Sequence, residues 1–139
     1  MTPEGQTKLK DFEGLRLKPY VDTVGKLTIG WGRNLSDRGI SYDEARLLFD
    51  DDVSIATAEA RANFDWFDTL SPVRQDFIVC MVFNLGVPRL RFFRRMLDAI
   101  ERQDWVSAGV ELLDSAWSRQ VGPHRSEAMR KAIVDGVWD

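Results

Sequence analysis

The sequence predicts a mainly helical α+β protein of two lobes, in which a long helix joins a small sheet lobe to a helical lobe. Three patterns predict this architecture. Residues 26–31 alternate between polar and apolar types, as a half-buried strand does. A helix-start signal at Ser41 opens a long run of helical spacing. Helical patterns with short breaks then fill the chain beyond Asn63.

Composition and charge exclude several classes of protein. The chain has 139 residues, of which 44% are hydrophobic and 29% charged, a balance that excludes disordered and membrane-spanning chains. The net charge of −3, with the acidity concentrated in residues 43–63, disfavours a general nucleic-acid-binding surface. Because residues 1–10 lack the apolar run of a secretory signal, we expect a cytoplasmic origin. Cys80 is the single cysteine, and its apolar neighbours predict a buried thiol.

Basic residues gather in one late stretch of the chain. These arginines are Arg89, Arg91, Arg94 and Arg95. We interpret them as a solvated helix face, with a local contact to an anionic surface as the alternative.

The chain begins with a helix that ends beside an acidic residue. Threonine and proline at residues 2–3 predict the helix start, and Leu9 and Phe12 are expected on its buried side. Gly14 is expected to end the helix, which leaves Glu13 in the last turn. The negative end of the helix dipole disfavours a charged carboxylate there, which suits a proton donor.

A hairpin is expected next. Pro19 predicts extended backbone, and Asp22 precedes a glycine turn. One face of the following strand is expected to carry the apolar residues Leu27, Ile29 and Trp31. Thr28 would lie on the opposite face, so that the helix-to-hairpin transition aims Glu13, Asp22 and Thr28 at one cleft. Residues 34–40 are expected to form a loop or short strand.

Ser41 and Glu44 match a capping box, which predicts the start of the long helix. Its apolar positions are Ala45, Leu48, Phe49, Val53 and Ala56. We therefore divide the chain into an N-terminal lobe of residues 1–42, a connecting helix of residues 43–63 and a helical lobe of residues 64–139.

The helical lobe is expected to surround one apolar helix. A serine and proline at residues 71–72 predict its start, and residues 77–85 are apolar on almost every side. Further core residues are expected at Phe92, Phe93, Met96, Leu97, Ile100, Trp105, Val110, Leu112, Leu113 and Trp117. A terminal helix is expected at residues 126–137, with Met129, Ile133 and Val134 packed inward.

In the stretch EGLRLKPYVDTVGKLTIGWG, eight residues separate Glu13 from Asp22 and five separate Asp22 from Thr28. This pattern resembles the phage-type lysozymes, the endolysins of glycoside hydrolase family 24. The similarity extends through SYDEARLLFDDDV and SPVRQDFIVCMVFNLG to the final DGVWD, which is nearly the whole chain. The resemblance implies a two-lobed lysozyme-like fold.

The resemblance also implies hydrolysis of the β-1,4 bond between N-acetylmuramic acid and N-acetylglucosamine in bacterial peptidoglycan. Glu13 would be the general acid, and Asp22, helped by Thr28, would activate a water for inversion. The two carboxyl groups would then lie roughly 6.5–9.5 Å apart. No cofactor, nucleic acid partner or membrane insertion is implied. The protein would act as a monomer, held in the host cytoplasm until a separate protein permeabilises the membrane.

Five further residues match substrate-binding positions of the family. They are Asn34, Phe83, Asn84, Gln120 and Arg125, of which Arg125 matches an arginine that approaches the catalytic glutamate. Phe83 fits the core equally well, and helical spacing favours a core role over sugar stacking for Trp105, Trp117 and Trp138. His124 has no clustered partners, so we expect no metal site there.

Two departures from the family pattern stand out. Arg33 replaces the histidine that commonly follows the glycine pair, and the net charge is acidic where many phage lysozymes are basic. Two other functions remain open: a catalytically silent wall-binding module of the same fold, and a glycosidase for a related polymer such as chitin.

Overall fold

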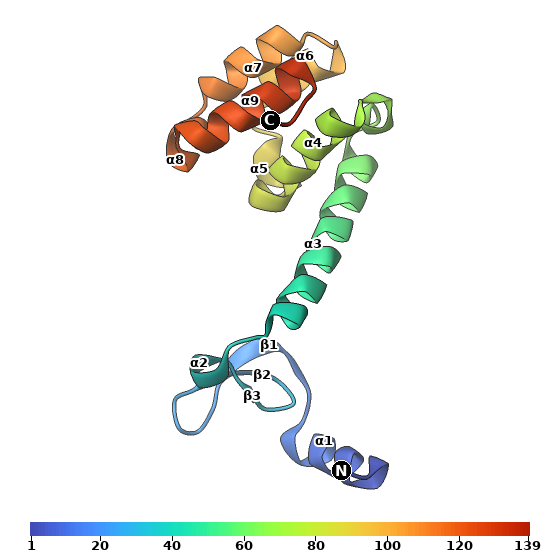
Figure 1. Cartoon of the computed structure of the whole chain (residues 1–139), viewed down its shortest axis with the longest axis vertical. Coiled ribbons are helices and arrows are strands. Elements are labelled where there is room, and N and C mark those ends of the chain that lie inside the picture. The colour runs from blue at the N-terminus through green and yellow to red at the C-terminus, as the bar shows by residue number, and fades with distance from the viewer. The chain divides into compact units, whose positions relative to one another are not determined.

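The structure, a computed structural model, describes all residues from 1 to 139 and divides into two compact units. Unit 1 is Met1–Leu48 and unit 2 is Phe49–Asp139. The boundary between them falls within helix α3 (Tyr42–Asn63) (Figure 1). The chain is mainly helical with one small antiparallel sheet, which confirms the predicted fold class. None of its helices has the length and apolar character needed to cross a membrane.

Helix α1 (Pro3–Glu13) has the predicted ends. The Thr2 hydroxyl accepts a hydrogen bond from the Gly5 N–H at 3.1 Å, which satisfies one backbone donor of the first turn. At the other end Gly14 adopts φ 70°, a left-handed conformation that glycine takes without strain. Both signals are local in sequence, and both are confirmed.

The predicted buried side of α1 is wrong. Phe12 is 80% exposed, Leu9 is also exposed, and no residue of the helix is buried. The helix meets the β2–β3 turn near its C-terminal end, where Lys10 and Glu13 reach residues 31–32. This contact is too small to cover an apolar stripe along the helix.

Three strands form the sheet of unit 1. They are β1 (Arg16–Val21), β2 (Leu27–Gly30) and β3 (Arg33–Asn34), antiparallel and in the order β1-β2-β3. Pro19 lies in β1, an edge strand whose pairing shifts register between Arg16 and Tyr20. Proline has no N–H to donate to a ladder, so an edge strand with an irregular register tolerates it.

The buried face of β2 is the one that carries Thr28 rather than the apolar face. Thr28 is 3% exposed, whereas Leu27 on the expected apolar face is exposed. Thr28 pairs with Tyr20 of β1 and with Asn34 of β3, so both neighbouring strands contribute a residue beside it. The central position in the sheet, which hydrophobic alternation does not reveal, decides its burial.

The segment before α3 is more ordered than a loop. Residues 33–34 form the short strand, but α2 (Leu35–Arg38) follows it, a helical turn that we did not predict. The predicted capping box is confirmed: the Ser41 hydroxyl accepts from the Glu44 N–H at 3.1 Å, and the Glu44 carboxylate accepts from the Ser41 N–H at 3.3 Å. Along α3 only Ala56 and Ala60 are buried.

Unit 2 is helical. Its elements after α3 are η1 (Phe67–Thr69), α4 (Pro72–Leu85), α5 (Val87–Leu90), α6 (Arg94–Glu101), α7 (Trp105–Leu113), α8 (Ala116–Val121) and α9 (Pro123–Asp135). Helices α7 and α9 lie side by side, and α4 packs against α9 (Figure 1). The core between them includes the fully buried Phe77, Ile78, Met81, Met96, Ile100, Leu112 and Ile133.

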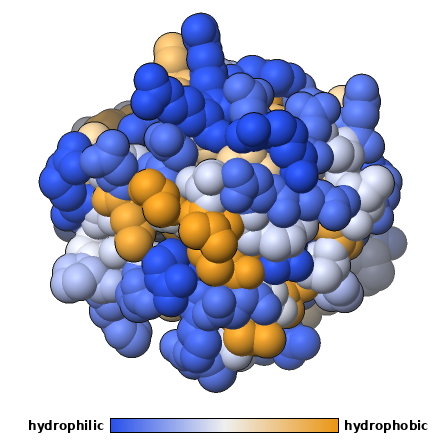
Figure 2. All heavy atoms as spheres, turned by 90° about the horizontal axis from the view of Figure 1, so that it is seen from above, coloured by the Kyte–Doolittle hydropathy of each residue, from blue (hydrophilic) through white to orange (hydrophobic).

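Several outer residues of unit 2 depart from the predicted core. Phe92 is 79% exposed, and Val110 and Leu113 are exposed as well. Figure 2 shows hydrophobic side chains on the viewed face in small groups set among hydrophilic ones. Cys80 is half-buried rather than buried, and burial raises the pKa of its thiol, with the nearby Asp76 carboxylate adding to the effect.

One long-range contact fastens the end of α9 to α4. The Arg74 guanidinium donates to the Ile133 carbonyl at 2.9 Å and to the Val134 carbonyl at 2.8 Å. It also lies over the Trp105 ring, 3.9 Å from the centroid. A cation at a helix C-terminus satisfies carbonyls that lack a partner within the helix. Desolvation by burial lowers the pKa of Arg74.

Candidate active site

Glu13 is the last residue of α1, and its exposed carboxyl group rests against Gly32. A Cβ at position 32 would lie 2.6 Å from Glu13 Oε2, closer than real Cβ contacts come, and Gly32 has φ +77°. The positive φ favours glycine, and a Cβ at this position would force the flexible Glu13 side chain to shift. The absence of a side chain at residue 32 therefore makes room for the Glu13 carboxyl group.

A hollow of about 340 Å³ opens beside Glu13. Trp31 and Lys10 contribute to its wall, and the Lys10 ammonium lies 4.6 Å from the centroid of the Trp31 ring. The sequence patterns did not identify Lys10 or Gly32 as site residues. The glycine pair at residues 30 and 32 was the available signal, but only the fold shows which of the two approaches Glu13.

Asp22 is held rigidly by the hairpin turn. Its Oδ1 accepts from the Val24 N–H at 2.9 Å and from the Lys26 N–H at 2.8 Å. The backbone of Asp22 also pairs with Lys26, whose carbonyl accepts from the Asp22 N–H at 2.9 Å. The turn thus fixes Oδ1 and leaves Oδ2 outside these hydrogen bonds.

Thr28 is connected to the same turn. Its hydroxyl donates to the Lys26 carbonyl at 2.9 Å, so this oxygen accepts both from Thr28 and from the Asp22 N–H. The hydroxyl proton is engaged locally, and only the oxygen lone pairs of Thr28 remain. The structure brings Asp22 and Thr28 together through Lys26 and brings Glu13 to the β2–β3 turn.

Asn34 acts as the N-cap of α2. Its Oδ1 accepts from the Asp37 N–H at 3.0 Å, and its Nδ2 donates to the Asp37 carboxylate at 3.0 Å. One N–H of the Asn34 amide stays available for a ligand. The Asn34–Asp37 spacing is a local capping signal, and it could have predicted the helical turn that starts here.

Arg33, which replaces the family's histidine, has a clear structural partner. Its Nη1 lies 2.7 Å from Glu44 Oε2 and donates to the Gly39 carbonyl at 3.2 Å. The Arg33 guanidinium, with further hydrogen bonds from Ser41, lowers the pKa of Glu44 to about 2. Arg33 therefore ties β3 to the first turn of α3.

In unit 2, two of the predicted residues gather around Trp117. Asn84 Oδ1 accepts from the Trp117 indole N–H at 2.8 Å, and the Arg125 guanidinium lies 5.7 Å from the Trp117 ring centroid. Trp117 is 4% exposed, which confirms its core role. Gln120 is exposed and follows Trp117 by three residues on α8. We call Asn84, Trp117, Gln120 and Arg125 the Trp117 surface.

Phe83 is 47% exposed, so the core alternative for this residue is wrong. Its ring lies 5.9 Å from that of Phe49, centroid to centroid. Trp105 is half-buried beneath Arg74, and Trp138 is exposed and donates to the Asp76 carboxylate at 3.1 Å. The ring of Phe83 is thus accessible on the exposed side of α4.

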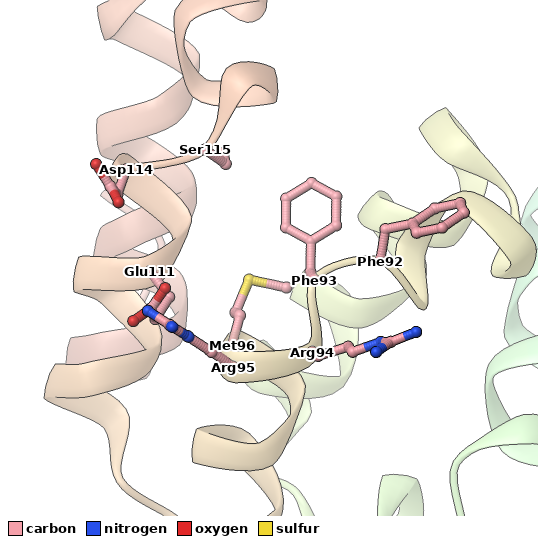
Figure 3. Close-up of a pocket in the computed structure, with 8 residues that line it drawn as sticks. All are labelled: Phe92, Phe93, Arg94, Arg95, Met96, Glu111, Asp114 and Ser115. Carbon is pink, nitrogen blue, oxygen red and sulfur yellow. The ribbon is translucent and has the colours of Figure 1, made fainter.

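One hollow in unit 2, about 430 Å³, lies where the start of α6 faces the end of α7 (Figure 3). Figure 3 shows the aromatic rings of Phe92 and Phe93 at its margin, and Arg95 and Glu111 on opposite helices. No residue that the sequence predicted for the site lines this hollow.

Comparison with known proteins places this geometry in context. Residues 10–131 match the family model described as "Phage lysozyme". The chain is 29% identical to "Probable T4-type lysozyme 1" of Dictyostelium discoideum, over 93% of this chain and 92% of that protein. It is 27% identical to "Endolysin" of Acyrthosiphon pisum secondary endosymbiont phage 1, over 86% of this chain and 80% of that protein. It is also 28% identical to "Pre-baseplate central spike protein Gp5" of Enterobacteria phage T4, over 81% of this chain and 24% of that protein.

Proposed function

This chain belongs to the phage lysozyme family and is a peptidoglycan-hydrolysing lysozyme, and we propose that it cleaves the β-1,4 bond between N-acetylmuramic acid and N-acetylglucosamine with inversion. The observation that carries the proposal is the geometry of Asp22. Two backbone N–H groups hold one of its oxygens, and the other is left for a water molecule. A general base needs such a fixed carboxylate with an uncommitted lone pair.

Glu13 acts as the general acid in this proposal. Its carboxyl group is exposed at the end of α1 and beside a hollow with an aromatic wall, where a sugar ring can reach it. It protonates the leaving glycosidic oxygen while Asp22 takes a proton from the attacking water. Water attack on the opposite face of the sugar inverts the anomeric carbon.

Thr28 supports this step by positioning. Its hydroxyl donates to the Lys26 carbonyl, which also accepts from the Asp22 N–H, so Thr28 stabilises the turn that orients the base. Its remaining lone pairs suit a hydrogen bond from the attacking water. Thr28→Val keeps the shape of the side chain and removes both contributions.

Substrate binding draws on five side chains in this proposal. They are Asn34 in unit 1 and Phe83, Asn84, Gln120 and Arg125 in unit 2. The Trp117 indole N–H donates to the amide oxygen of Asn84, which leaves the NH₂ group of Asn84 to donate to an N-acetyl or hydroxyl oxygen of the substrate. The exposed ring of Phe83 suits the apolar face of a sugar.

The proposal also covers the setting of the reaction. The protein acts as a monomer, accumulates in the host cytoplasm and reaches the wall after a separate protein permeabilises the membrane. Gel filtration at working concentration tests the first part. Fractionation of cells that express the chain with and without a membrane-permeabilising protein tests the second.

The decisive test compares wild type with Glu13→Gln on purified peptidoglycan. We expect the wild type to release fragments that end in reducing N-acetylmuramic acid and Glu13→Gln to release none, because the variant lacks the donated proton at nearly constant shape. Glu4→Gln, on the first turn of the same helix, is the matched control and should stay active. NMR of the first product formed reads its anomeric configuration, and hence inversion or retention.

The outcomes separate the alternatives. Full turnover by Glu13→Gln would reject Glu13 as the acid. Wall binding without cleavage by both proteins would favour the silent module. Cleavage of chitin at a rate equal to that on peptidoglycan would favour the glycosidase for a related polymer.

A further inference from the structure

A second hollow of unit 2, about 360 Å³, lies where the end of α3 and the loop after it face α6. Pockets that hold small ligands measure roughly 300–1,000 Å³, so this one has room for a short ligand segment. None of the residues that we assign to catalysis or to the Trp117 surface lines it. Its lining is mainly polar and mixes aromatic, amide and charged side chains.

An aromatic pair stands at one side of this hollow. The rings of Phe64 and Trp66 are tilted by 31° with centroids 5.0 Å apart. Phe64 is buried and Trp66 is half-buried, so Phe64 anchors the pair in the core and Trp66 keeps part of its ring accessible. A partly exposed, rigid aromatic ring is the surface on which a flat, weakly polar ligand face can rest.

Planar hydrogen-bonding groups stand beside the aromatic pair. Arg91 Nη2 donates to the Asn63 amide oxygen at 3.0 Å, and its guanidinium lies 5.5 Å from the Phe64 ring centroid. This contact holds the Arg91 guanidinium and the Asn63 amide in place, and further N–H groups of the guanidinium can still donate to a ligand. The ligand groups that match them are hydroxyl and acetamido oxygens.

Carboxylates supply the matching acceptors. Asp98 and Glu101 stand three residues apart on α6 and therefore share one helix face. Both are exposed, and neither has an ion-pair partner. Each carboxylate can accept two hydroxyl protons from one ligand.

The charge of the lining selects among ligand classes. Asp65, Asp98 and Glu101 repel a phosphate or carboxylate, and Arg91 and Arg94 repel a strong cation. The acidic residues do not form a group that could hold a metal ion. A neutral ligand with many hydroxyl groups and one flat apolar face satisfies all parts of the lining.

We propose that this hollow is a second saccharide site, which binds N-acetylated amino-sugar units of a glycan strand without cleaving them. The inference rests on the proposed function, because the glycan strands of peptidoglycan are then the ligand at hand. A contact at this site would lengthen the residence of the protein on the wall without involving the catalytic carboxylates.

The test titrates the full-length Glu13→Gln protein, labelled with ¹⁵N, with the tetrasaccharide of N-acetylglucosamine. We expect the Trp66 indole N–H signal to shift. We also expect the double variant Asp98→Ala/Glu101→Ala to reduce the affinity measured from that signal about tenfold, as for two hydrogen bonds of ordinary net strength. The matched control Asp51→Ala/Glu59→Ala removes the same charge from exposed positions of α3 and should retain parental affinity.

Each result decides the matter. An unmoved Trp66 signal, or equal affinity in the double variant and its control, would overturn the inference. Tighter binding of the deacetylated, cationic tetrasaccharide would overturn the choice of a neutral sugar. Peptidoglycan hydrolysis by wild type is measured separately, so a hollow that fails to bind sugar is distinguished from a protein that fails to cleave it.

Discussion

Gly32→Ala tests the placement of Glu13 most directly. An alanine Cβ at this position would stand 2.6 Å from Glu13 Oε2 and 3.1 Å from the carboxyl carbon, whereas real Cβ atoms essentially never come within 3.0 Å. The carboxyl group must therefore retreat. Because residue 32 also has φ +77°, alanine adds backbone strain of about 1–2 kcal/mol.

Gly30→Ala separates these two effects. Gly30 has φ +71°, and a Cβ there meets nothing within 4 Å. Both variants should lose about 1–2 kcal/mol of folding free energy through backbone strain. Only Gly32→Ala should also displace the acid, and a misplacement on the order of 1 Å at a reacting group costs up to about 100-fold in rate.

The assay measures peptidoglycan hydrolysis at a temperature where circular dichroism shows both variants fully folded. We expect Gly32→Ala to lower kcat about 10- to 100-fold and Gly30→Ala to lower it much less. Equal losses would attribute the effect to backbone strain. Wild-type kcat in Gly32→Ala would refute the reasoning that this contact sets the position of the catalytic acid.

The contacts of other ionisable groups lead to three further predictions. Arg74→Ala should lower the free energy of unfolding of unit 2 by about 2–3 kcal/mol in urea titrations, because the Ile133 and Val134 carbonyls lose a charged donor. A loss below about 0.5 kcal/mol would contradict this role. Arg74→Lys should recover only part of the lost free energy of unfolding. The folded-state pKa of Glu44, about 2, lies below its usual 4.5, so its stabilising effect is present above pH 4.5 and is lost as the pH falls toward 2. Wild type should therefore lose more stability over that range than Glu44→Gln, and parallel pH profiles would exclude this linkage. Burial raises the pKa of Cys80, so iodoacetamide should alkylate it more slowly at about pH 8 than a free cysteine peptide, and an equal rate would refute the assignment.

Local sequence signals predicted the caps of α1 and α3 well, whereas the terminal helix runs over Pro123–Asp135 rather than the predicted residues 126–137. The Thr2 cap, the Gly14 stop and the reciprocal bonds of Ser41 and Glu44 all join residues within four positions of one another. At residues 71–72 the predicted helix start is also correct, but the Ser71 hydroxyl is buried without a hydrogen-bond partner. The position of a cap is thus more predictable than the bond it makes.

The burial of side chains was predicted less well. The exposure of Phe12 and Phe92 and the burial of Thr28 reverse what hydrophobic periodicity indicates. Periodicity identifies which residues share a face of an element but not what that face meets. The face that carries Thr28 lies between two neighbouring strands, which bury it. The face that carries Phe12 has no covering layer in unit 1.

The candidate site shows the same division. The spacing of Glu13, Asp22 and Thr28 and the likeness to phage lysozymes are properties of the sequence, and they determined the family and the candidate chemistry. The structure added the hydrogen bonds that hold Asp22, and it identified residue 32 as the glycine that accommodates Glu13.

The sequence by itself determined the mainly helical α+β class, the caps of α1 and α3 and the three residues proposed for catalysis, because local backbone preferences and spacing are written in neighbouring residues. The tertiary structure alone decided which distant groups meet. Glu13 reaches Gly32, Asn84 accepts from Trp117, and Arg74 binds the end of α9. Such contacts depend on how whole elements pack, and no short window of sequence contains both partners.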